Sequence, residues 1–229
     1  MDYPVPADES ARLEALRKLQ LLDTLGEEAY DSITELIAEV LDMPIALISL
    51  VDEDRQWFKS KIGLDRQSTS REVAFCTYNI LDDDMLIVED ALEDERFATN
   101  PLVLEDPNIR FYAGSPLHAP SGHRVGSLCV IDNKPRTLDS RQLRILEALG
   151  KQVDSLFKIR QISHELHQSR QLNRDLKRLL PICTICGRVK QADDWAELEE
   201  YIQSNTSEQL SRQVCPDCSA DLDENFDLV

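Results

Sequence analysis

The residues with the most specific chemistry are two Cys-x-x-Cys pairs near the end of the sequence, Cys183 with Cys186 and Cys215 with Cys218. Two intervening residues let both sulfurs of a pair turn toward one centre while backbone N–H groups donate to them, and two such pairs complete a tetrahedron. We therefore predict a structural zinc ion on these four cysteines. Four protein ligands leave no position open for water, so this zinc would not be catalytic.

The cysteines define a second module over residues 181–229, which begins at Pro181. With 49 residues and few large apolar groups, this module could hardly fold without the stability that a metal supplies. Its cysteine pattern also resembles rubredoxin, which would place iron and one-electron transfer here. A helix signal over 195–202 and the lack of rubredoxin's aromatic pattern after Gly187 favour zinc. Oxidation that expels the zinc is a further alternative.

The formal net charge of −18 makes nucleic acids and anionic membrane surfaces poor partners, because like charges repel. No nearly apolar run approaches the roughly 20 residues that span a bilayer. The first ten residues lack the basic and apolar regions of a secretory signal. We therefore expect a cytoplasmic protein with reduced thiols, whose cysteines bind metal, react or lie buried.

The charge is unevenly distributed along the chain. Residues 1–150 hold 15 basic and 29 acidic groups, residues 151–180 hold 7 and 3, and residues 181–229 hold 3 and 11. A basic middle segment therefore separates two acidic ends. The acidic runs over 82–84 and 93–95 lack the spaced ligands and turn glycine of a calcium loop, so we interpret them as solvated surface.

The elements that must position any site in the first 150 residues are helices and antiparallel strands. Apolar spacing predicts helices over 11–22 and 33–41. Short, apolar or β-branched runs predict strands, with a polar turn at 52–55 joining the first two and Ser121-Gly122-His123 joining the last two. The predicted strands are 45–51, 56–62, 86–88, 110–117 and 125–131. This order indicates an α+β domain with an antiparallel sheet.

Several ordered blocks of this first domain resemble GAF domains of bacterial signalling proteins. They are Pro44-Ile-Ala-Leu-Ile-Ser-Leu-Val-Asp52, Arg55-Gln-Trp-Phe-Lys59, Phe75-Cys76, Val88-Glu-Asp-Ala91, Arg110-Phe-Tyr-Ala-Gly-Ser-Pro-Leu117 and Gly126-Ser-Leu-Cys-Val-Ile-Asp132. The resemblance covers about residues 10–157, and we assign 1–157 to a GAF sensory domain. It implies a twisted antiparallel sheet with helices on one face and a ligand pocket on the other, and it implies no catalytic activity.

The resemblance also implies candidate ligand-binding residues, taken from the blocks around the ligand side of such domains. These are Phe75, Cys76, Tyr78, Asp90, Phe97, Phe111, Tyr112 and Ser115. Such an aromatic-lined concavity would suit a small planar or polar ligand; the alternative is that the phenylalanines are core. Cys76 is the better candidate for a reactive thiol, whereas Cys129, inside an apolar run, is expected to be buried. Neither cysteine has the neighbourhood that anchors a bilin, and their blocks do not resemble free methionine sulfoxide reductase.

A long helix is predicted over 139–180, with Ser140 near its N-cap, because only Gly150 interrupts a run without Gly or Pro. Apolar residues at 146, 149, 153 and 156 form one stripe. After a slip of three residues, a heptad seam follows at Ile162, Leu166, Ser169, Asn173, Leu176 and Leu180. The seam predicts a coiled coil and a parallel homodimer; the alternative is a helix that folds back onto its own domain. His164 resembles a kinase phosphoacceptor but lacks the rest of that motif.

Taken together, these features predict a sensor or adaptor in signal transduction and not an enzyme. The GAF domain would bind a small ligand or a protein partner, the dimeric helix would relay the change, and the zinc module would dock onto a signalling protein. The competing interpretation is a redox-responsive protein that uses Cys76 or the four-cysteine site.

Overall fold

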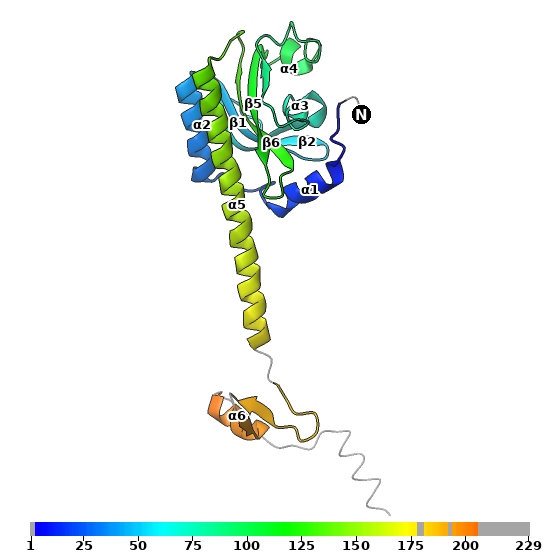
Figure 1. The fold of residues 1–229 in the computed structure, drawn as a ribbon, viewed down its shortest axis with the longest axis vertical. Coiled ribbons are helices and arrows are strands. Elements are labelled where there is room, and N and C mark those ends of the chain that lie inside the picture. Colours follow the sequence, from blue (N-terminus) through cyan, green and yellow to red (C-terminus); the bar gives the residue numbers. More distant parts are fainter. Residues whose placement is uncertain (1–2, 178–180, 192–193, 206–229) are drawn as a thin grey trace, which may run out of the picture. The chain divides into compact units, whose positions relative to one another are not determined.

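The computed structural model describes residues 3–177, 181–191 and 194–205 (Figure 1). The chain divides into two compact units, residues 1–167 and 168–229, and each is described by itself. Cys215, Cys218 and Leu180 of the sequence predictions lie outside the described residues. Among the residues that are described, no helix is long and apolar enough to cross a membrane.

The first unit is built on a six-stranded antiparallel sheet with strand order β3-β2-β1-β6-β5-β4. Its strands are β1 (Ile45–Val51), β2 (Arg55–Ile62), β3 (Ser68–Ser70), β4 (Leu86–Val88), β5 (Phe111–His118) and β6 (Arg124–Asp132). The five predicted strands are confirmed within one residue at each end. The turn at Gly122 between β5 and β6 is confirmed as well, and its φ of +87° is one that glycine adopts without strain. The three-residue strand β3 was missed because it is too short to show a period.

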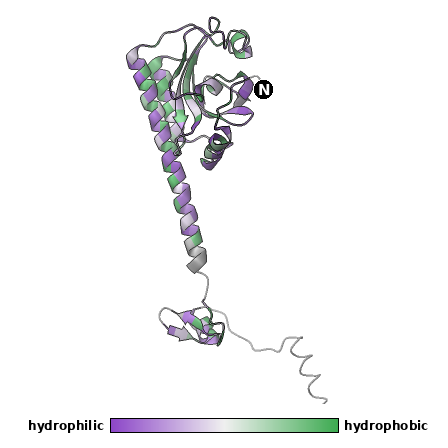
Figure 2. Cartoon of the chain, turned by 45° about the vertical axis from the view of Figure 1, so that its right-hand side comes forward, coloured by the Kyte–Doolittle hydropathy of each residue, from purple (hydrophilic) through white to green (hydrophobic). Residues whose placement is uncertain are grey.

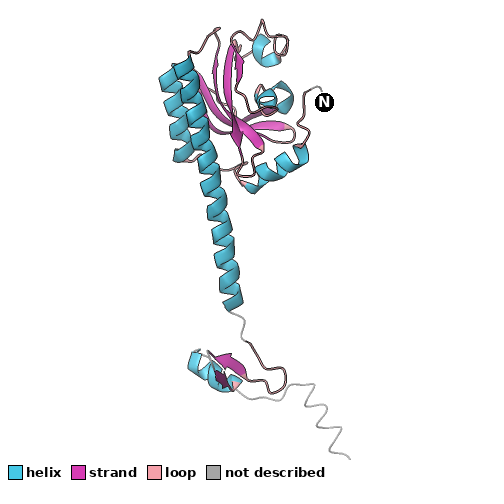
Figure 3. Cartoon of the chain, in the orientation of Figure 1, coloured by secondary structure: helices cyan, strands magenta, loops and turns pink. Residues whose placement is uncertain are grey.

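Three helices cover one face of the sheet: α1 (Glu9–Lys18), α2 (Glu28–Leu41) and the first half of α5 (Ser140–Lys177). Figure 3 shows α2 and α5 side by side against the strands. Alternate strand residues such as Ile48, Leu50 and Val130 enter the core between helices and sheet, because successive strand side chains point to opposite faces.

Among the described residues, the opposite face carries only short helical segments: η1 (Arg71–Val73), α3 (Cys76–Asn79) and α4 (Pro101–Leu104). A second apolar core lies between them and the sheet, and it includes Leu47, Phe58 and Cys129. These segments were not predicted because a helix of three or four residues has too few residues to reveal a period. The irregular chain between β2 and β5 therefore forms the second layer.

The first helix is shorter than the sequence predicts. The expected helix over 11–22 ends at Lys18, because Gln20 adopts a left-handed conformation with φ of 50°. Leu19 and Leu21 are nonetheless completely buried. The apolar residues after the helix thus continue into the core on a non-helical backbone, which a pattern of apolar positions does not distinguish from a further helical turn.

Helix α5 begins as predicted but is capped by Asp139 and not by Ser140. The Asp139 carboxylate accepts the backbone N–H groups of Arg141 and Gln142, at 2.7 and 2.8 Å. Leu146 and Val153 of the predicted stripe are buried in the helix-side core, and Leu149 and Leu156 pack against it. The beginning of α5 therefore does fold onto its own domain.

Beyond this stripe, α5 presents apolar side chains to solvent. Ile159, Ile162 and Leu166 are 63%, 58% and 49% exposed. Figure 2 shows that hydrophobic positions recur between hydrophilic ones along the helix. The side chains at seam positions 173 and 176 lie outside the described residues. A coiled coil stays a prediction that rests on the exposed residues Ile162 and Leu166.

In the second unit, β7 (Val189–Gln191) and β8 (Asp194–Ala196) form a hairpin, followed by α6 (Leu198–Asn205). The helix predicted to begin at Trp195 was placed too early. Trp195 belongs to β8, where it is paired with Lys190 across the hairpin, so the helix begins three residues later.

Candidate functional site

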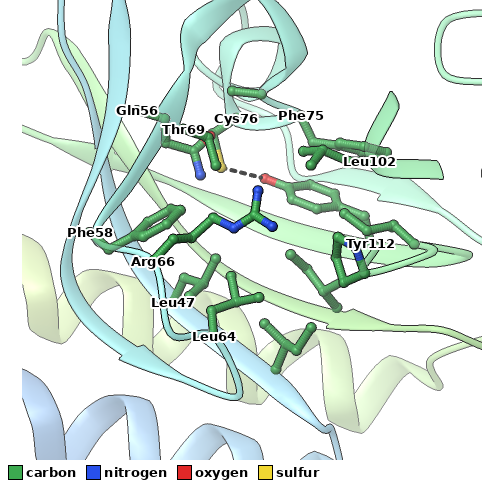
Figure 4. Close-up of a pocket in the computed structure, with 15 residues that line it drawn as sticks. Leu47, Gln56, Phe58, Leu64, Arg66, Thr69, Phe75, Cys76, Leu102 and Tyr112 are labelled. Carbon is green, nitrogen blue, oxygen red and sulfur yellow. Dashed lines mark hydrogen bonds between the residues drawn. The ribbon is translucent and has the colours of Figure 1, made fainter. Parts of the chain in front are cut away.

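The sheet face that α5 does not cover contains a small, mainly apolar cavity (Figure 4). Its volume is about 30 Å³ for the centres of water-sized molecules, against the roughly 10–15 Å³ that one water requires by this measure. The apolar wall comes from β1, β2, β6, α4 and the segment before β5. It is formed chiefly by Ile45, Leu47, Phe58, Leu102, Ile109 and Ile131. The cavity as it stands admits a molecule of only a few non-hydrogen atoms.

Two polar side chains that line the cavity carry oxygen atoms with no hydrogen-bond partner among the described residues. Gln56 is 5% exposed, and its Oε1 atom is buried and unpaired; Thr69 Oγ1 is also buried and unpaired. Gln56 on β2 lies directly opposite Thr69 on β3 in the sheet register. Leaving a buried polar group unpaired costs roughly 1–3 kcal/mol each. A ligand or water that pairs with both atoms would recover this free energy.

A buried cluster of thiols and hydroxyls adjoins the cavity, and two of its members, Cys76 and Tyr112, line the wall. Ser49 donates from Oγ to Cys76 Sγ at 3.1 Å, and Tyr112 Oη lies 3.2 Å from the same sulfur. Cys129 Sγ is 3.9 Å from Cys76 Sγ. All four side chains are buried. The cluster unites residues from β1, α3, β5 and β6.

The two thiols of this cluster differ in acidity. The hydrogen bond with Cys76 and burial raise the pKa of Cys129 well above its ordinary value. Burial opposes ionisation of Cys76 as well, but hydrogen bonds from Cys129, Ser49 and Tyr112 lower its pKa. Cys76 is therefore the thiol of the pair that ionises first.

One cationic side chain lies among the described residues that line the cavity, that of Arg66 in the loop between β2 and β3. Its guanidinium lies 3.7 Å from the carboxylate of Asp106, which follows α4, and the two side chains are 44% and 91% exposed. An exposed pair at this separation contributes little, about 0–1 kcal/mol. Arg66 can therefore exchange Asp106 for another anion at small cost.

Of the sequence-predicted ligand residues, Phe75, Cys76 and Tyr112 line the cavity. Phe97 lies behind Phe75, with ring centroids 4.0 Å apart, and Tyr78 meets Phe97 edge-on at 4.9 Å. These rings form a layer that supports the wall from behind. Phe97 is thus core, as the alternative interpretation held for it, whereas Phe75 belongs to both the core and the cavity.

Three other predicted residues do not meet at this cavity. Phe111 and Ser115 lie on the helix side of β5, opposite to Tyr112, because side chains alternate along a strand. Ser115 faces Gly150 of α5, where an added Cβ would lie 2.6 Å from the Ser115 hydroxyl. Asp90 caps the turn after β4 by accepting the N–H of Leu92 at 3.0 Å.

Sequence reasoning missed the three side chains that carry the polar character of the cavity: Gln56, Arg66 and Thr69. Gln56 did have a signal, since it shares a strand face with the apolar Phe58. A polar residue on a buried strand face needs a partner. Thr69 gave no signal, because only the pairing of β2 with β3 places it there.

Strand β2 also connects the cavity to α5. Lys59, on the helix side of β2, has a completely buried side chain and donates from Nζ to Glu27 Oε1 at 2.6 Å. Arg160 of α5 donates to the same carboxylate at 2.9 Å and to the backbone carbonyl of Leu19 at 3.0 Å. Burial works against the charge on Glu27, but Lys59 and Arg160 lower its pKa. The three charges fasten α5 to the strand that carries Gln56.

A second anchor joins the end of β5 to α5. Asp154 accepts the backbone N–H of His118 through Oδ1 at 2.7 Å, and its Oδ2 lies 3.2 Å from the Nδ1 atom of His118. The hydrogen bond with Asp154 raises the pKa of His118 although partial burial opposes this. The first half of α5 is therefore held at both β2 and β5.

The described half of the cysteine module contains a tight turn between Cys183 and Gly187. The carbonyl of Cys183 accepts the N–H of Gly187 at 2.9 Å, and Gly187 has a φ of +73°, which favours glycine. Hydrogen bonds from the backbone N–H groups of Cys186 and Ile185 lower the pKa of Cys183. This arrangement suits a thiolate ligand. Cys215 and Cys218 lie outside the described residues, and the described residues alone contain no cluster of three metal ligands.

The first unit is thus a six-stranded antiparallel sheet with helices on one face and a cavity on the other. Residues 26–155, more than half of the chain, match the GAF domain family, and the protein belongs to that family. GAF domains of bacterial signalling proteins are generally regulatory and not catalytic.

One curated relative is a cyclic di-GMP phosphodiesterase of Pseudomonas aeruginosa. It is 43% identical over 151 residues, which cover 66% of this chain and 26% of that protein. The match thus spans about a quarter of the relative's length, so the phosphodiesterase activity is not assigned to this chain.

Solved structures share the fold at low identity. The free methionine-R-sulfoxide reductase of Neisseria meningitidis, solved with its substrate, has a TM-score of 0.50 and 14% identity, and the match covers 71% of this chain and 98% of that one. The GAF domain of an Acinetobacter phosphoenolpyruvate-protein phosphotransferase has a TM-score of 0.48 and 19% identity, with 65% and 93% covered. The likeness to the reductase, at a TM-score of 0.50, shows the fold alone.

Proposed function

We propose that this protein is a cytoplasmic sensor or adaptor in signal transduction whose GAF domain binds a small ligand. The observation that carries the proposal is the cavity with the unpaired Gln56 and Thr69 oxygens on the sheet face opposite α5. Unpaired buried polar groups are costly in a structural core and are useful in a binding site. The curated relative supports this role, since its matching region belongs to a protein named as a cyclic di-GMP phosphodiesterase.

The relay that we propose begins at strand β2. Gln56 and Phe58 face the cavity, while Lys59 between the strand and the helices holds Glu27, which in turn holds Arg160 of α5. A ligand that pulls β2 toward itself would change the balance of this buried charge network. Helix α5 would then pass the change to the cysteine module, which docks onto another signalling protein.

Dimerisation is the second part of the proposal. Ile162 and Leu166 are exposed on α5 at the spacing of a heptad seam, and burying them against a second copy would remove about half of each side chain from water. The seam contains Asn173, a residue type that fixes register in parallel two-stranded coils. In a parallel homodimer, ligand binding in the two cavities would act on the two paired α5 helices.

Replacing Ile162 with glutamate should convert the dimer to a monomer, because two carboxylates would face each other in the seam. Sedimentation velocity at micromolar concentration measures the change. Gln171→Glu adds the same charge at an exposed position on the outer face of the same helix and should remain dimeric. A monomeric wild type, or a dimer that persists in Ile162→Glu, would contradict the proposed coiled coil.

Ligand binding is tested by native mass spectrometry of the full chain purified from its own host. We expect a retained small molecule in the wild type. Leu64→Trp should abolish retention, since Leu64 lines the cavity and is only partly buried, so that a larger ring fills the space without a core rearrangement. Leu25→Trp is the control, because Leu25 is 89% exposed. Retention that survives Leu64→Trp, or no retained mass in the wild type, would refute ligand binding in this cavity.

A redox-responsive protein is the second candidate, and the distance of 3.9 Å between Cys76 Sγ and Cys129 Sγ favours it. Peroxide can oxidise one thiol to a sulfenic acid, which condenses with the second thiol to a disulfide and releases water. The denatured mass from the same preparation separates the candidates: a Cys76–Cys129 disulfide removes two hydrogen atoms, and a reduced chain with a retained ligand excludes it as the resident state.

A further inference from the structure

We propose that the cavity binds a small organic carboxylate that carries a hydroxyl or amino group at its other end. This inference rests on the proposed sensor function and names the chemical class of its ligand. Three features of the cavity lead to it: an unpaired polar end, an apolar middle and one cationic side chain. Figure 4 shows Gln56, Thr69 and Arg66 around the same space.

The polar end requires a hydrogen-bond donor. Gln56 Oε1 is an acceptor, and Thr69 Oγ1 can both donate and accept. The two residues are paired across β2 and β3, and neither oxygen has a hydrogen-bond partner in the part of the chain that the structure describes. A hydroxyl or amino group can donate to Gln56 and engage Thr69 at the same time. A purely apolar molecule would bury both oxygens without compensation, at a cost of roughly 1–3 kcal/mol each.

The middle of the cavity is apolar and suits a hydrocarbon segment of the ligand. Its walls are formed by Leu47, Phe58 and Ile131. The thiol of Cys76 and the hydroxyl of Tyr112 also line it, but they are already hydrogen-bonded to each other. The volume open to the centres of water-sized molecules is about 30 Å³, which restricts the ligand to a short chain. A nucleotide or a tetrapyrrole would not fit among the side chains as they lie.

The charge of the ligand follows from Arg66. It is the only charged side chain among the described residues that line the cavity, and its one ion pair, with Asp106, is 3.7 Å long and exposed. A carboxylate can take the place of Asp106 and accept two parallel N–H bonds from the guanidinium. A cationic ligand would meet Arg66 with like charge. The loop between β2 and β3 would close over the ligand by this contact.

Isothermal titration calorimetry of the full chain tests the class with named probes: 3-hydroxypropanoate, 4-hydroxybutanoate and 4-aminobutanoate. Butanoate lacks the inner polar group and butane-1,4-diol lacks the charge. At least one of the three acids should bind to the protein. Both incomplete analogues should bind at least tenfold more weakly than that acid, a difference in binding free energy of about 1.4 kcal/mol or more. If none of the three acids binds, or if butanoate binds as tightly as they do, the proposal is wrong.

Variants assign the two ends of the ligand. Gln56→Leu should weaken the best probe at least tenfold and leave butanoate within twofold; Thr69→Val tests the same end if Gln56→Leu does not fold. Arg66→Gln should weaken every acid at least tenfold and leave butane-1,4-diol unaffected. Arg141→Gln makes the same charge change at an exposed position of α5 and should change nothing. Equal affinities in Arg66→Gln and wild type would overturn the assignment.

The failure of this inference is distinguishable from failure of the sensor function. A retained host molecule that lacks a carboxylate, and that disappears in Leu64→Trp, would overturn the ligand class while the sensor function stands. The absence of any retained molecule together with the absence of binding by the three acids would count against both.

Discussion

Gly126→Ala is expected to destabilise the GAF domain by roughly 3 kcal/mol or more. Gly126 lies in β6, between Leu50 of β1 and Leu117 of β5. A Cβ atom at this position would overlap the carbonyl oxygen of Ser49 and lie 3.0 Å from its carbonyl carbon. Both atoms belong to the backbone of a central strand. Relief would require β1 and β6 to separate, which breaks the ladder on which both cores rest.

The measurement is chemical unfolding by urea, with the free energy extrapolated to water. Gly122→Ala is the matched control, since nothing lies within 4 Å of the position its Cβ would occupy. Its φ of +87° still makes alanine unfavourable, by about 1–2 kcal/mol. If Gly126→Ala lowers the free energy of unfolding by no more than Gly122→Ala does, β1 and β6 do not approach as closely as described.

Removal of the proposed zinc is expected to unfold the cysteine module and leave the GAF domain folded. Zinc sites of this kind contribute apparent binding free energies of about 10–16 kcal/mol, and small modules depend on them. In the described part of the module, α6 has no buried residue and Ile185 is 95% exposed, so apolar burial contributes little to its stability. The two units are separate in the contact pattern of the chain, so the loss of one should spare the other.

Cys183→Ser tests this expectation. Elemental analysis should find one zinc per wild-type chain and none in the variant, and circular dichroism should show one melting transition lost and the GAF transition unchanged. Thr184→Ser alters the residue beside Cys183, keeps all thiols and should retain the metal. A red colour of the purified wild-type protein would indicate iron instead of zinc. One zinc per chain in Cys183→Ser would contradict the predicted ligand set.

The parts of the fold that sequence analysis predicted are those whose pattern is local and long enough to repeat. The apolar run Ile45–Val51 and the polar turn after it predicted a hairpin, and α5 was predicted because 38 residues contain only one glycine and no proline. The elements that were missed, such as α3 and β3, span only three or four residues. Their conformation is decided by what they pack against and not by their own sequence.

For the site, sequence alone determined which residue types were available and, for Phe75, Cys76 and Tyr112, the blocks that carry them to the cavity. The tertiary structure decided which of the eight candidates face the same space. It put Phe111 and Ser115 on the far side of β5, since neighbouring strand residues face in opposite directions.

The tertiary structure alone also brought together residues that no local pattern connects. Gln56 meets Thr69 because β2 pairs with β3, and Cys76 meets Cys129, 53 positions later, because α3 packs over β6. Register between strands depends on the whole sheet and its turns, and it cannot be obtained from one segment. The ordered sequence blocks between Pro44 and Asp132 indicated the family, whereas the chemistry of the cavity arose only from the folded chain.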